Sequence, residues 1–494
     1  MKRLSLVLIG VIILSAGINC KKDTPNPPPP PPPPPPTTGP PPPPAVNRPP
    51  KANAGPDQVL TLPVNATTLN GTASSDSDGN NLTYYWRSIS GPGGGSITSE
   101  NTAHPFIFNL PEGQHTYKLE VWDGFPNSFS YDTIVVTVVR PSYCTGNRQE
   151  VPLQFTLLSN LPYPMNLPNI YATGNKLLVM TRNIDMNSTF PLSIYDRTTQ
   201  TWTSSLLSMG RQGMEIIAAG NKLIFAGGII YDQTGYNFTC TDKIDIYDIA
   251  TNSWSDATLS EARFACKATL VGNKILFSGG LKTDRTFSNK VDIYDLSTNS
   301  WSVTQFPGTK RMVMTAVSSG NKVFLCGGYT AFQDYTGYGE VFGEPVNVID
   351  VYDANTWQWS QATMLKTKSE FGAVVFDEKL YLAGGYDPIE RLWQLDVEIL
   401  DVNNLNRIVS CLIQPNSFFD NDVVVQNNKL IFAGDRSISG ISPNKIDIYD
   451  PASQTWSIGT LSNGMLPGRL ASAIVSVGNE LYAIFDNKLY KVDF

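Results

Sequence analysis

The chain has 494 residues, more than one ordinary hydrophobic core can organise, so we expect two or three folded units. Charged residues make up only 16% of it, whereas Gly and Pro together number 76 and aromatic residues reach 11%, which favours short strands and turns over long charged helices. The net charge of −7 argues against a general nucleic-acid binder, and six scattered cysteines are too few for a disulfide-built scaffold.

The first 19 residues have the layout of a bacterial secretory signal. Lys2 and Arg3 precede an apolar stretch, residues 4–18, that is too short for a stable membrane span, and the stretch ends close to Cys20. This arrangement resembles a lipoprotein signal, which implies that Cys20 is lipidated and begins the mature chain. The residues before it, Gly-Ile-Asn, depart from the usual lipoprotein pattern, so a plain signal peptide is the alternative. No Asp follows Cys20 directly, which favours anchorage in the outer membrane, at the cell surface.

Residues 20–47 are dominated by proline, with unbroken runs at 27–36 and 40–44. Proline fixes φ and removes the backbone donor, so these runs predict an extended polyproline II stalk that joins no core. At ~3.1 Å per residue, the segment from Cys20 to Pro50 spans roughly 90 Å. The stalk is expected to hold the following domains away from a membrane.

Residues 48–140 alternate short strand patterns with turn clusters, which predicts a β-sandwich. The segments ANAGPDQVLTL, LNGTASSDSDGNNLTYYW and YKLEVWDGFPNSFSYDTIVVTVV resemble PKD and related Ig-like domains of extracellular proteins. The family's W-D-F-G-D-G signature is absent, since Trp86 is followed by RSISGPG. The resemblance implies a spacer or adhesive module, with Trp86 and Trp122 expected in its core.

Asp76, Asp78 and Asn80 form an oxygen-rich loop within this segment. Carboxylate and amide oxygens are Ca²⁺ ligands, so the loop is a weak calcium candidate, although no distant ligand can be identified. The alternative is a polar turn whose side chains bond to their own backbone. We favour the turn and expect no cofactor elsewhere in the chain.

The remaining five cysteines are Cys144, Cys240, Cys266, Cys326 and Cys411. Five is an odd number, so at least one is expected to be a free thiol, and Cys326 in VFLCGG has the surroundings of a buried strand. The pairing cannot be deduced from the sequence.

Residues 141–494 contain a repeat whose period is near 50 residues. A turn marker of the GNK type recurs seven times and is followed by an apolar strand. Four of the repeats then have a glycine pair, and five have a tryptophan after a third strand such as DIYD. The marker positions are Asn175, Asn221, Asn273, Asn321, Glu378, Asn428 and Asn479. A four-stranded unit of this length buries its faces only by stacking on its neighbours, as the blades of a β-propeller do.

Paired glycines followed by Tyr and Trp resemble the Kelch repeat. The predicted fold is therefore all-β: a seven-bladed Kelch-type β-propeller after an Ig-like/PKD β-sandwich. The last repeat stops after three strands, and an orphan strand, VPLQFTLL, precedes the first repeat. Because a closed ring leaves no exposed edge, we expect this orphan strand to complete the last blade.

Ten residues before each marker lies a position that is basic in five of the seven repeats: Arg211, Arg263, Arg311, Lys368 and Arg469, with Met165 and Phe418 in the other two. The register places these residues where each innermost strand begins, around the mouth of the central channel. A ring of such groups would bind a carboxylate, sulfate or phosphate through bidentate hydrogen bonds. The alternative is structural, with each basic side chain paired to loop carbonyls or acids.

Both histidines, His104 and His115, lie in the sandwich segment, so the propeller has no imidazole for catalysis or for a copper or zinc site. We therefore assign no catalytic residue and expect a binding module for glycans or anionic ligands at the propeller loop face. A protein–protein adhesion module is the alternative. The propeller also resembles bacterial sialic-acid mutarotases, and Glu215, Glu261, Glu370 and Asp420 lie near the basic positions in sequence, so carboxylate chemistry is a second, weaker alternative.

Overall fold

The computed structural model describes residues 30–31, 46–62, 64–93, 95–141, 144, 148–165, 168–181, 191–232, 237–330, 343–388, 392–412, 423–433, 445–461 and 473–494. The chain divides into two units, Met1–Asn47 and Arg48–Phe494, and the strands belong to the second. The predicted signal peptide, Cys20 and nearly all of the proline-rich stalk lie outside the described residues. Within the part that is described, no apolar helix of membrane-spanning length occurs.

The first strands form a sandwich of two sheets, as predicted. One sheet has the order β1-β7-β6-β3 and the other the order β2-β5-β4. β1 pairs with β7 in parallel, whereas the remaining pairs in both sheets are antiparallel. The bounds are β1 Gln58–Thr61, β2 Thr67–Thr68, β3 Thr83–Ser90, β4 Ser96–Thr98, β5 Phe106–Phe108, β6 Gly113–Trp122 and β7 Phe129–Val139.

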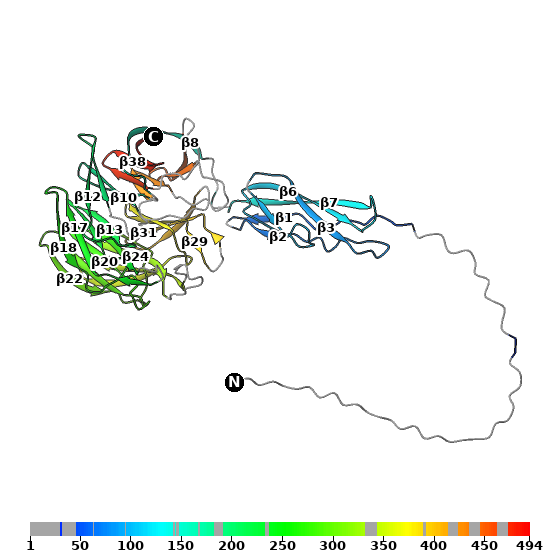
Figure 1. Cartoon of the computed structure of the whole chain (residues 1–494), viewed down its shortest axis with the longest axis horizontal. Helices are drawn as coiled ribbons and strands as arrows, with labels where there is room; N and C mark the ends of the chain where they lie inside the picture. The colour runs from blue at the N-terminus through cyan, green and yellow to red at the C-terminus, as the bar shows by residue number, and fades with distance from the viewer. Residues whose placement is uncertain are drawn as a thin grey trace, which may run out of the picture. The chain divides into compact units, whose positions relative to one another are not determined.

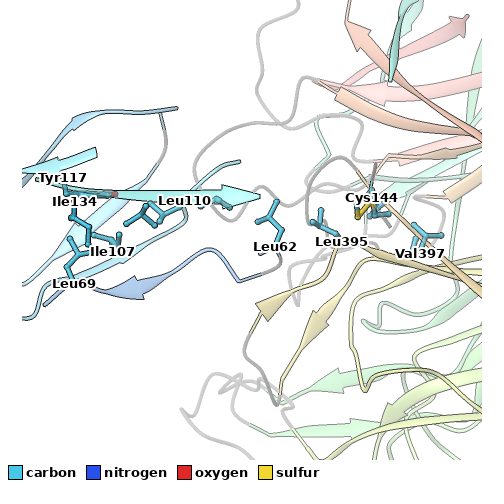
Figure 2. Packing of buried hydrophobic residues seen from close by; sticks show 14 of the residues in the cluster. Leu62, Leu69, Ile107, Leu110, Tyr117, Ile134, Cys144, Leu395 and Val397 are labelled. Carbon is cyan, nitrogen blue, oxygen red and sulfur yellow. A yellow bond between two sulfur atoms is a disulfide. The ribbon is translucent and has the colours of Figure 1, made fainter. Parts of the chain in front are cut away.

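The sandwich core is built from the alternate residues of these strands that point inward. Figure 2 shows Leu69, Ile107, Tyr117 and Ile134 gathered in this core, and all four are buried. Trp86 is also buried, as predicted, and its indole Nε1 donates to the Thr102 carbonyl at 3.1 Å. Trp122 is different: its side chain is 37% exposed, so its expected place in the core is wrong.

The repeat array folds into blades, each a four-stranded antiparallel sheet in the described residues. The strands of each blade are given from the innermost to the outermost. Blade one is β9 Pro168–Thr173, β10 Lys176–Thr181, β11 Pro191–Asp196 and β12 Thr201–Leu206, and blade two is β13 Glu215–Ala219, β14 Lys222–Ala226, β17 Lys243–Asp248 and β18 Ser253–Thr258. Blade three is β19 Lys267–Val271, β20 Lys274–Ser278, β21 Lys290–Asp295 and β22 Ser300–Gln305, and blade four is β23 Thr315–Ser319, β24 Lys322–Tyr329, β25 Pro345–Asp353 and β26 Gln358–Thr363.

Blade five is β27 Gly372–Phe376, β28 Lys379–Ala383, β31 Asp396–Asp401 and β32 Arg407–Cys411. Blade six is β33 Val423–Gln426, β34 Lys429–Phe432, β35 Lys445–Asp450 and β36 Thr455–Leu461. Blade seven is β37 Ala473–Val477, β38 Glu480–Phe485, β39 Lys488–Asp493 and β8 Gln149–Asn160. Two hairpins extend the loops of blades two and five: β15 Ile229–Tyr231 with β16 Phe238–Cys240, and β29 Tyr386–Asp387 with β30 Leu392–Trp393.

The ring of seven blades closes through the orphan strand, as predicted. β8 pairs antiparallel with β39 and so becomes the outermost strand of blade seven (Figure 1). Its first residues, Gln149 to Leu153, also pair in parallel with β36 of blade six. The innermost strands contact one another in succession, and β37 returns to β9. One strand therefore joins the first part of the propeller to its last two blades.

The glycine pairs allow neighbouring blades to approach closely. Gly227 and Gly228 have φ of +64° and +112°, and a Cβ on Gly227 would lie 2.2 Å from the carbonyl oxygen of Arg263 in the next blade. The Gly228 amide donates to that same oxygen at 3.0 Å. The sequence interpretation of these glycines as points of close approach is confirmed.

The tryptophans fill the outer spaces between blades. Trp254 packs on Tyr247 with ring centroids 4.9 Å apart, and its Nε1 donates to the Ser205 hydroxyl on the outer strand of the preceding blade at 2.8 Å. Trp202 and Trp456 make the corresponding bonds to Ser159 and Ser410.

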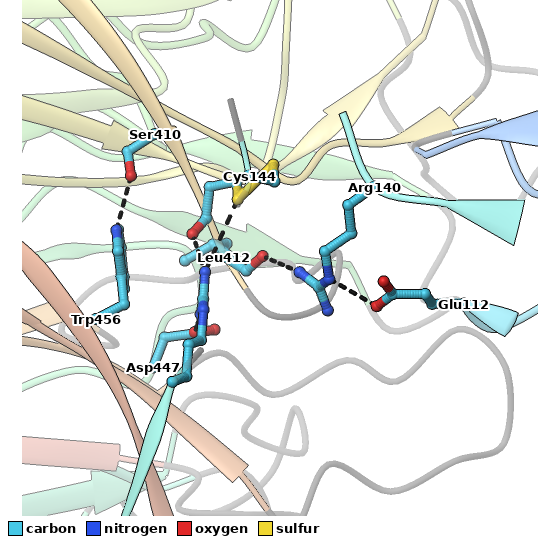
Figure 3. Close-up of a disulfide and its surroundings, with 9 residues drawn as sticks. Glu112, Arg140, Cys144, Ser410, Leu412, Asp447 and Trp456 are labelled. Atoms are coloured by element: carbon cyan, nitrogen blue, oxygen red, sulfur yellow. Dashed lines mark hydrogen bonds and ion pairs between the residues drawn. A yellow bond between two sulfur atoms is a disulfide. The ribbon is translucent and has the colours of Figure 1, made fainter. Parts of the chain in front are cut away.

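A disulfide joins Cys144 to Cys411 at the end of β32, with a Cα–Cα distance of 5.5 Å (Figure 3). Nearby, the Arg140 guanidinium donates to Glu112 at 2.6 Å and to the Leu412 carbonyl at 3.2 Å. The other three described cysteines, Cys240, Cys266 and Cys326, are buried free thiols, as expected for Cys326. Burial raises the pKa of the Cys266 thiol to about 12, which makes it a poor nucleophile.

Candidate functional site

The basic position before each innermost strand lies inside its own blade. Arg211 and Arg311 are each 1% exposed, and each forms an ion pair with an aspartate in the middle of the third strand of the same blade. The N–O distances are 2.6 Å for Arg211–Asp245 and 2.6 Å for Arg311–Asp350. Arg263, which is fully buried, pairs with Asp292 in the same way.

These guanidinium groups also bond to backbone carbonyls. Arg211 donates to the carbonyl oxygens of Gly227 at 2.7 Å and Phe225 at 3.1 Å. Arg311 makes the equivalent bonds to Gly327 at 2.9 Å and Leu325 at 3.1 Å. Each arginine thus ties the second strand, the glycine pair and the third strand of a blade together.

Lys368 is the fourth member of the set and is 3% exposed. Its Nζ lies 3.4 Å from the Leu382 carbonyl, and Glu398 occupies the acidic position of the third strand in this blade. Burial lowers the pKa of the Lys368 ammonium, and the negative charge of Glu398 opposes that shift. The ion pair of this acid is formed with Arg407 instead, whose Nε lies 3.2 Å from the Glu398 carboxylate.

The two exceptional blades extend the pattern. In blade six the acid is Asp447, and its cation is Arg148, which comes from the segment just before β8 and also donates to the Cys411 carbonyl. In blade one the basic position is Met165 and the acidic position is Ser193, so both charges are absent together. Arg469 and Phe418 lie outside the described residues.

The four described basic residues do not form an open ring around the channel mouth, which corrects their expected role as ligand-binding groups. Aspartates neutralise the three arginines within their blades, and Lys368 is buried at the same position of its own blade, so this geometry favours the structural alternative. Their acidic partners were not predicted, although an acid recurs at the third position of KIDIYD, KVDIYD and VIDVYD. That acid disappears in PLSIYD, the repeat whose basic position is Met165.

The innermost strands enclose a central cavity of about 530 Å³. Most of its lining is small or apolar, but its polar lining includes Glu215, Lys267, Thr315 and Glu370. Three of these residues begin an innermost strand, and Glu370 lies two residues before one. They therefore lie at the end of the channel where the connections between blades enter.

Glu215 and Lys267 link blades two and three at this mouth. The Glu215 carboxylate accepts a hydrogen bond from the Ala268 amide at 2.8 Å, and its other oxygen lies 3.8 Å from the Lys267 ammonium nitrogen. The two side chains are 13% and 17% exposed, so they are partly desolvated and retain access to the cavity. Aromatic and aliphatic walls with a few fixed polar groups are typical of small-molecule sites.

The other acids named from the sequence are placed differently. Glu261 accepts from the Ser288 hydroxyl at 2.6 Å and lies 3.8 Å from Arg263, so it supports the loops between blades. Asp420 lies outside the described residues. Of the three described acids, Glu215 and Glu370 line the cavity.

The calcium candidate in the sandwich has the geometry of a turn. Asp76 Oδ1 accepts from the amides of Asp78 at 2.8 Å and Asn80 at 3.2 Å, and the Asp78 carboxylate pairs with Arg48 at 2.7 Å. This arrangement matches the Asx-turn alternative. Across the described residues, no group of three or more His, Cys, Asp or Glu side chains is arranged to hold a metal ion.

Two family models match the chain. A "PKD domain" model matches residues 54–138, and the model described as "KLHDC2/KLHL20/DRC7 Kelch-repeats domain" matches residues 265–485. Both matches agree with the resemblances recognised in the sequence.

Curated relatives match one part of the chain or the other. The mouse (Mus musculus) "Dyslexia-associated protein KIAA0319-like protein" is 40% identical over 77 residues, which is 16% of this chain and 7% of the relative. "Alpha-scruin" of Limulus polyphemus is 28% identical over 230 residues, or 45% of this chain and 24% of the relative. "Kelch-like protein 23" of Pongo abelii is 22% identical over 62% of this chain and 48% of the relative. The chain spans only a small part of the length of the first of these relatives.

A solved structure titled "Structure of YjhT" aligns with 61% of this chain and 99% of that chain, with 13% identity and a TM-score of 0.44.

Proposed function

Because the chain joins a PKD domain to a Kelch-repeat β-propeller, two domain types that act as binding or protein-interaction modules, we propose that it is a binding protein of the bacterial cell surface rather than an enzyme. The signal-like N-terminus and Cys20 support export and a lipid anchor in the outer membrane. The Cys144–Cys411 disulfide supports the same location, because such bonds persist in oxidising compartments.

The observation that carries the binding role is the central cavity, with Glu215 and Lys267 fixed at its mouth. A rigid ring with a recessed, partly polar opening suits a small ligand or the end of a longer one. Because the arginines are neutralised inside the blades, the charged groups at the opening are Glu215, Glu370 and Lys267, which include both acidic and basic side chains. A neutral or zwitterionic glycan therefore fits the mouth better than the acidic ligand that an open basic ring would favour.

The test is a glycan-array screen of the chain without its lipid, residues 21–494, with neutral and acidic sugars side by side. We expect binding to neutral or zwitterionic glycans, and we expect the double variant E215Q/K267M to lose it. E480Q/K491M is the matched control, because it removes a similar ion pair of 3.0 Å on the second and third strands of blade seven. Silence across the array would overturn the glycan assignment and favour the protein-adhesion alternative, to be pursued by pull-down from cell envelopes.

The anchor has its own test. Replacing Cys20 with Ser should move the full-length protein from the membrane fraction to the soluble periplasmic or secreted fraction, since one lipidated cysteine is the proposed attachment. Unchanged retention in the outer membrane fraction would contradict a lipid anchor at this position.

A further inference from the structure

One face of the β1-β7-β6-β3 sheet of the sandwich carries aromatic side chains in solvent. In the register of the three strands, Tyr85 on β3 lies opposite Glu120 on β6, and Glu120 lies opposite Tyr131 on β7. In the adjacent row Trp122 on β6 lies opposite Phe129 on β7. Side chains in these rows share one face because residues two apart in a strand point the same way.

The four rings are exposed by 46% for Tyr85, 37% for Trp122, 41% for Phe129 and 53% for Tyr131. Single exposed aromatic residues are ordinary, but a contiguous group on a flat sheet face indicates an interaction surface. We call Tyr85, Glu120, Trp122, Phe129 and Tyr131 the aromatic face.

The aromatic face is ordered by local contacts. The Trp122 indole Nε1 donates to the Phe125 carbonyl at 2.7 Å, and its ring stacks on Phe129 with an interplanar angle of 21°. The Lys118 ammonium lies 3.7 Å from the centre of the Tyr131 ring. Rings held in place before binding lose little conformational entropy when a ligand arrives.

The same face is hollowed and carries polar groups. A depression of about 360 Å³ is lined by Tyr85, Glu120, Trp122 and Phe129 together with Thr83 and Asn101. Among the described residues, the side chains of Glu120 and Asn101 have no hydrogen-bond or ion-pair partner, so the Glu120 carboxylate and the Asn101 amide can bond to a ligand. Aromatic planes beside carboxylate, amide and hydroxyl groups provide both stacking surfaces and hydrogen-bond partners.

We infer that the aromatic face binds an extended polysaccharide. The apolar faces of pyranose rings would stack on Trp122 and Tyr85, and the sugar hydroxyls would donate to Glu120 and bond to Asn101. The rings lie side by side on neighbouring strands, and such strands are about 4.8 Å apart in a sheet. This flat arrangement suits an extended chain of sugars better than a compact cation, which is usually enclosed by a cage of rings.

A protein partner fits this face less well. The centres of protein interfaces are depleted of charge, whereas the Glu120 carboxylate lies between Tyr85 and Tyr131 in the middle of this face. A sugar hydroxyl can instead donate to this carboxylate while leaving it partly hydrated. The inference concerns the sandwich alone and stands independently of the function proposed for the propeller channel.

The test is retention of the lipid-free chain, residues 21–494, on insoluble chitin and cellulose and in affinity electrophoresis with soluble β-glucan. We expect the wild type to bind at least one of these probes and the Y85A/W122A variant to bind it about tenfold or more weakly, because each lost ring contact removes a share of the stacking free energy. Glu120→Gln should weaken binding by a smaller factor. W357A is the matched control, since Trp357 is 55% exposed on the propeller.

Unfolding midpoints of all variants provide the check on folding, and the exposure of Tyr85 and Trp122 predicts little change. Three results of the polysaccharide assays would overturn the inference: no retention of the wild type on any probe, retention that survives in Y85A/W122A, or loss of retention in E215Q/K267M instead. The last result would assign polysaccharide binding to the propeller channel, so failure of this inference and failure of the proposed function are distinguishable. If the wild type instead captures an envelope protein and Y85A/W122A does not, the face is a protein interface and the inference is wrong.

Discussion

At the scale of single residues, the buried acid–base pairs account for much of the repeat signature. An arginine such as Arg311 satisfies two carbonyls and one carboxylate at once, all within a blade. Removing the cation would leave Asp350 buried without its charge partner, which is among the costliest single changes in a protein interior. In blade one the same two positions hold uncharged residues, Met165 and Ser193.

We therefore predict that Arg311→Met lowers the free energy of unfolding by about 3–5 kcal/mol. The double variant R311M/D350S, which copies the residues of blade one, should recover at least half of that loss because no uncompensated charge remains. Chemical denaturation of both variants measures the difference. A double variant no more stable than the single one would mean that the carbonyl bonds of Arg311, rather than the charge pairing, dominate.

A second residue-scale prediction concerns the aspartate that ends the third strand. The Asp196 carboxylate accepts from Lys176 and from the amides of Thr199 and Thr198, and these bonds lower its pKa from 3.8 to about 2. Between pH 2 and 4 the unfolded chain then binds more protons than the folded chain, so this contribution to stability is present above pH 4 and is lost as the pH falls towards 2.

Asp196→Asn should accordingly be less stable than the wild type at pH 6, and the difference should shrink as the pH approaches 2. Urea denaturation at several pH values measures this trend. A difference between the two proteins that stayed constant over the range would show that Asp196 acts only through the shape of the turn.

The direction in which the basic side chains point could not be predicted from the sequence. The positions of Arg211, Arg263, Arg311 and Lys368 were identified from the repeat, but a basic residue before a strand can point to a channel mouth or fold back into its own blade. The acid inside the third strand decides between these alternatives, as the ion pair of Asp245 with Arg211 shows. The pairing of Arg148 with Asp447 crosses nearly 300 residues and has no local signal.

At the scale of elements, the glycine pairs are required by contact as well as by conformation. Gly227 and Gly220 both have φ near +60°, but a Cβ on Gly220 would meet nothing within 4 Å, whereas one on Gly227 would clash with the backbone of Arg263. Gly220→Ala should cost about 1–2 kcal/mol from the left-handed conformation alone. Gly227→Ala should cost several kcal/mol more, because blades two and three must separate. Equal losses in thermal or chemical unfolding of the two variants would contradict the close-approach argument.

Most of the strands and their grouping into blades could be predicted from the sequence. Seven copies of the marker, with the glycine pair in four repeats and the tryptophan in five, predict seven blades, and the missing fourth strand of the last copy predicts the role of β8. The parallel pairing of β8 with β36 was not predicted, because hydrogen bonding between neighbouring blades has no periodic signature. Trp122 was misplaced for a related reason: its alternation along β6 is clear, but which face of the sheet is covered depends on the second sheet.

At the scale of the whole molecule, the Cys144–Cys411 bond closes a loop of 267 residues. In the chain-entropy account, a crosslink of this length restricts the unfolded ensemble and stabilises the folded protein by several kcal/mol, typically about 2–5. C144S/C411S should therefore unfold at lower denaturant concentration than the wild type. Reduction should destabilise the wild type and leave the double variant unchanged, with Cys240→Ser as a control that still responds to reductant. A wild type indifferent to reductant would contradict a stabilising disulfide.

The position of β8 also has a consequence for biogenesis. It is the first propeller strand to be synthesised, yet its main partner, β39, is the last. At synthesis rates of about 5–20 residues per second, β39 follows β8 by roughly 15 to 70 s. Until β36 is made, late in that interval, β8 has both edges open to pairing with other chains, which is the condition that invites aggregation. The yield of folded protein would then depend on how well this one strand is shielded until its partners are made, and a circular permutant that starts at β9 and ends with β8 would place β8 directly after β39.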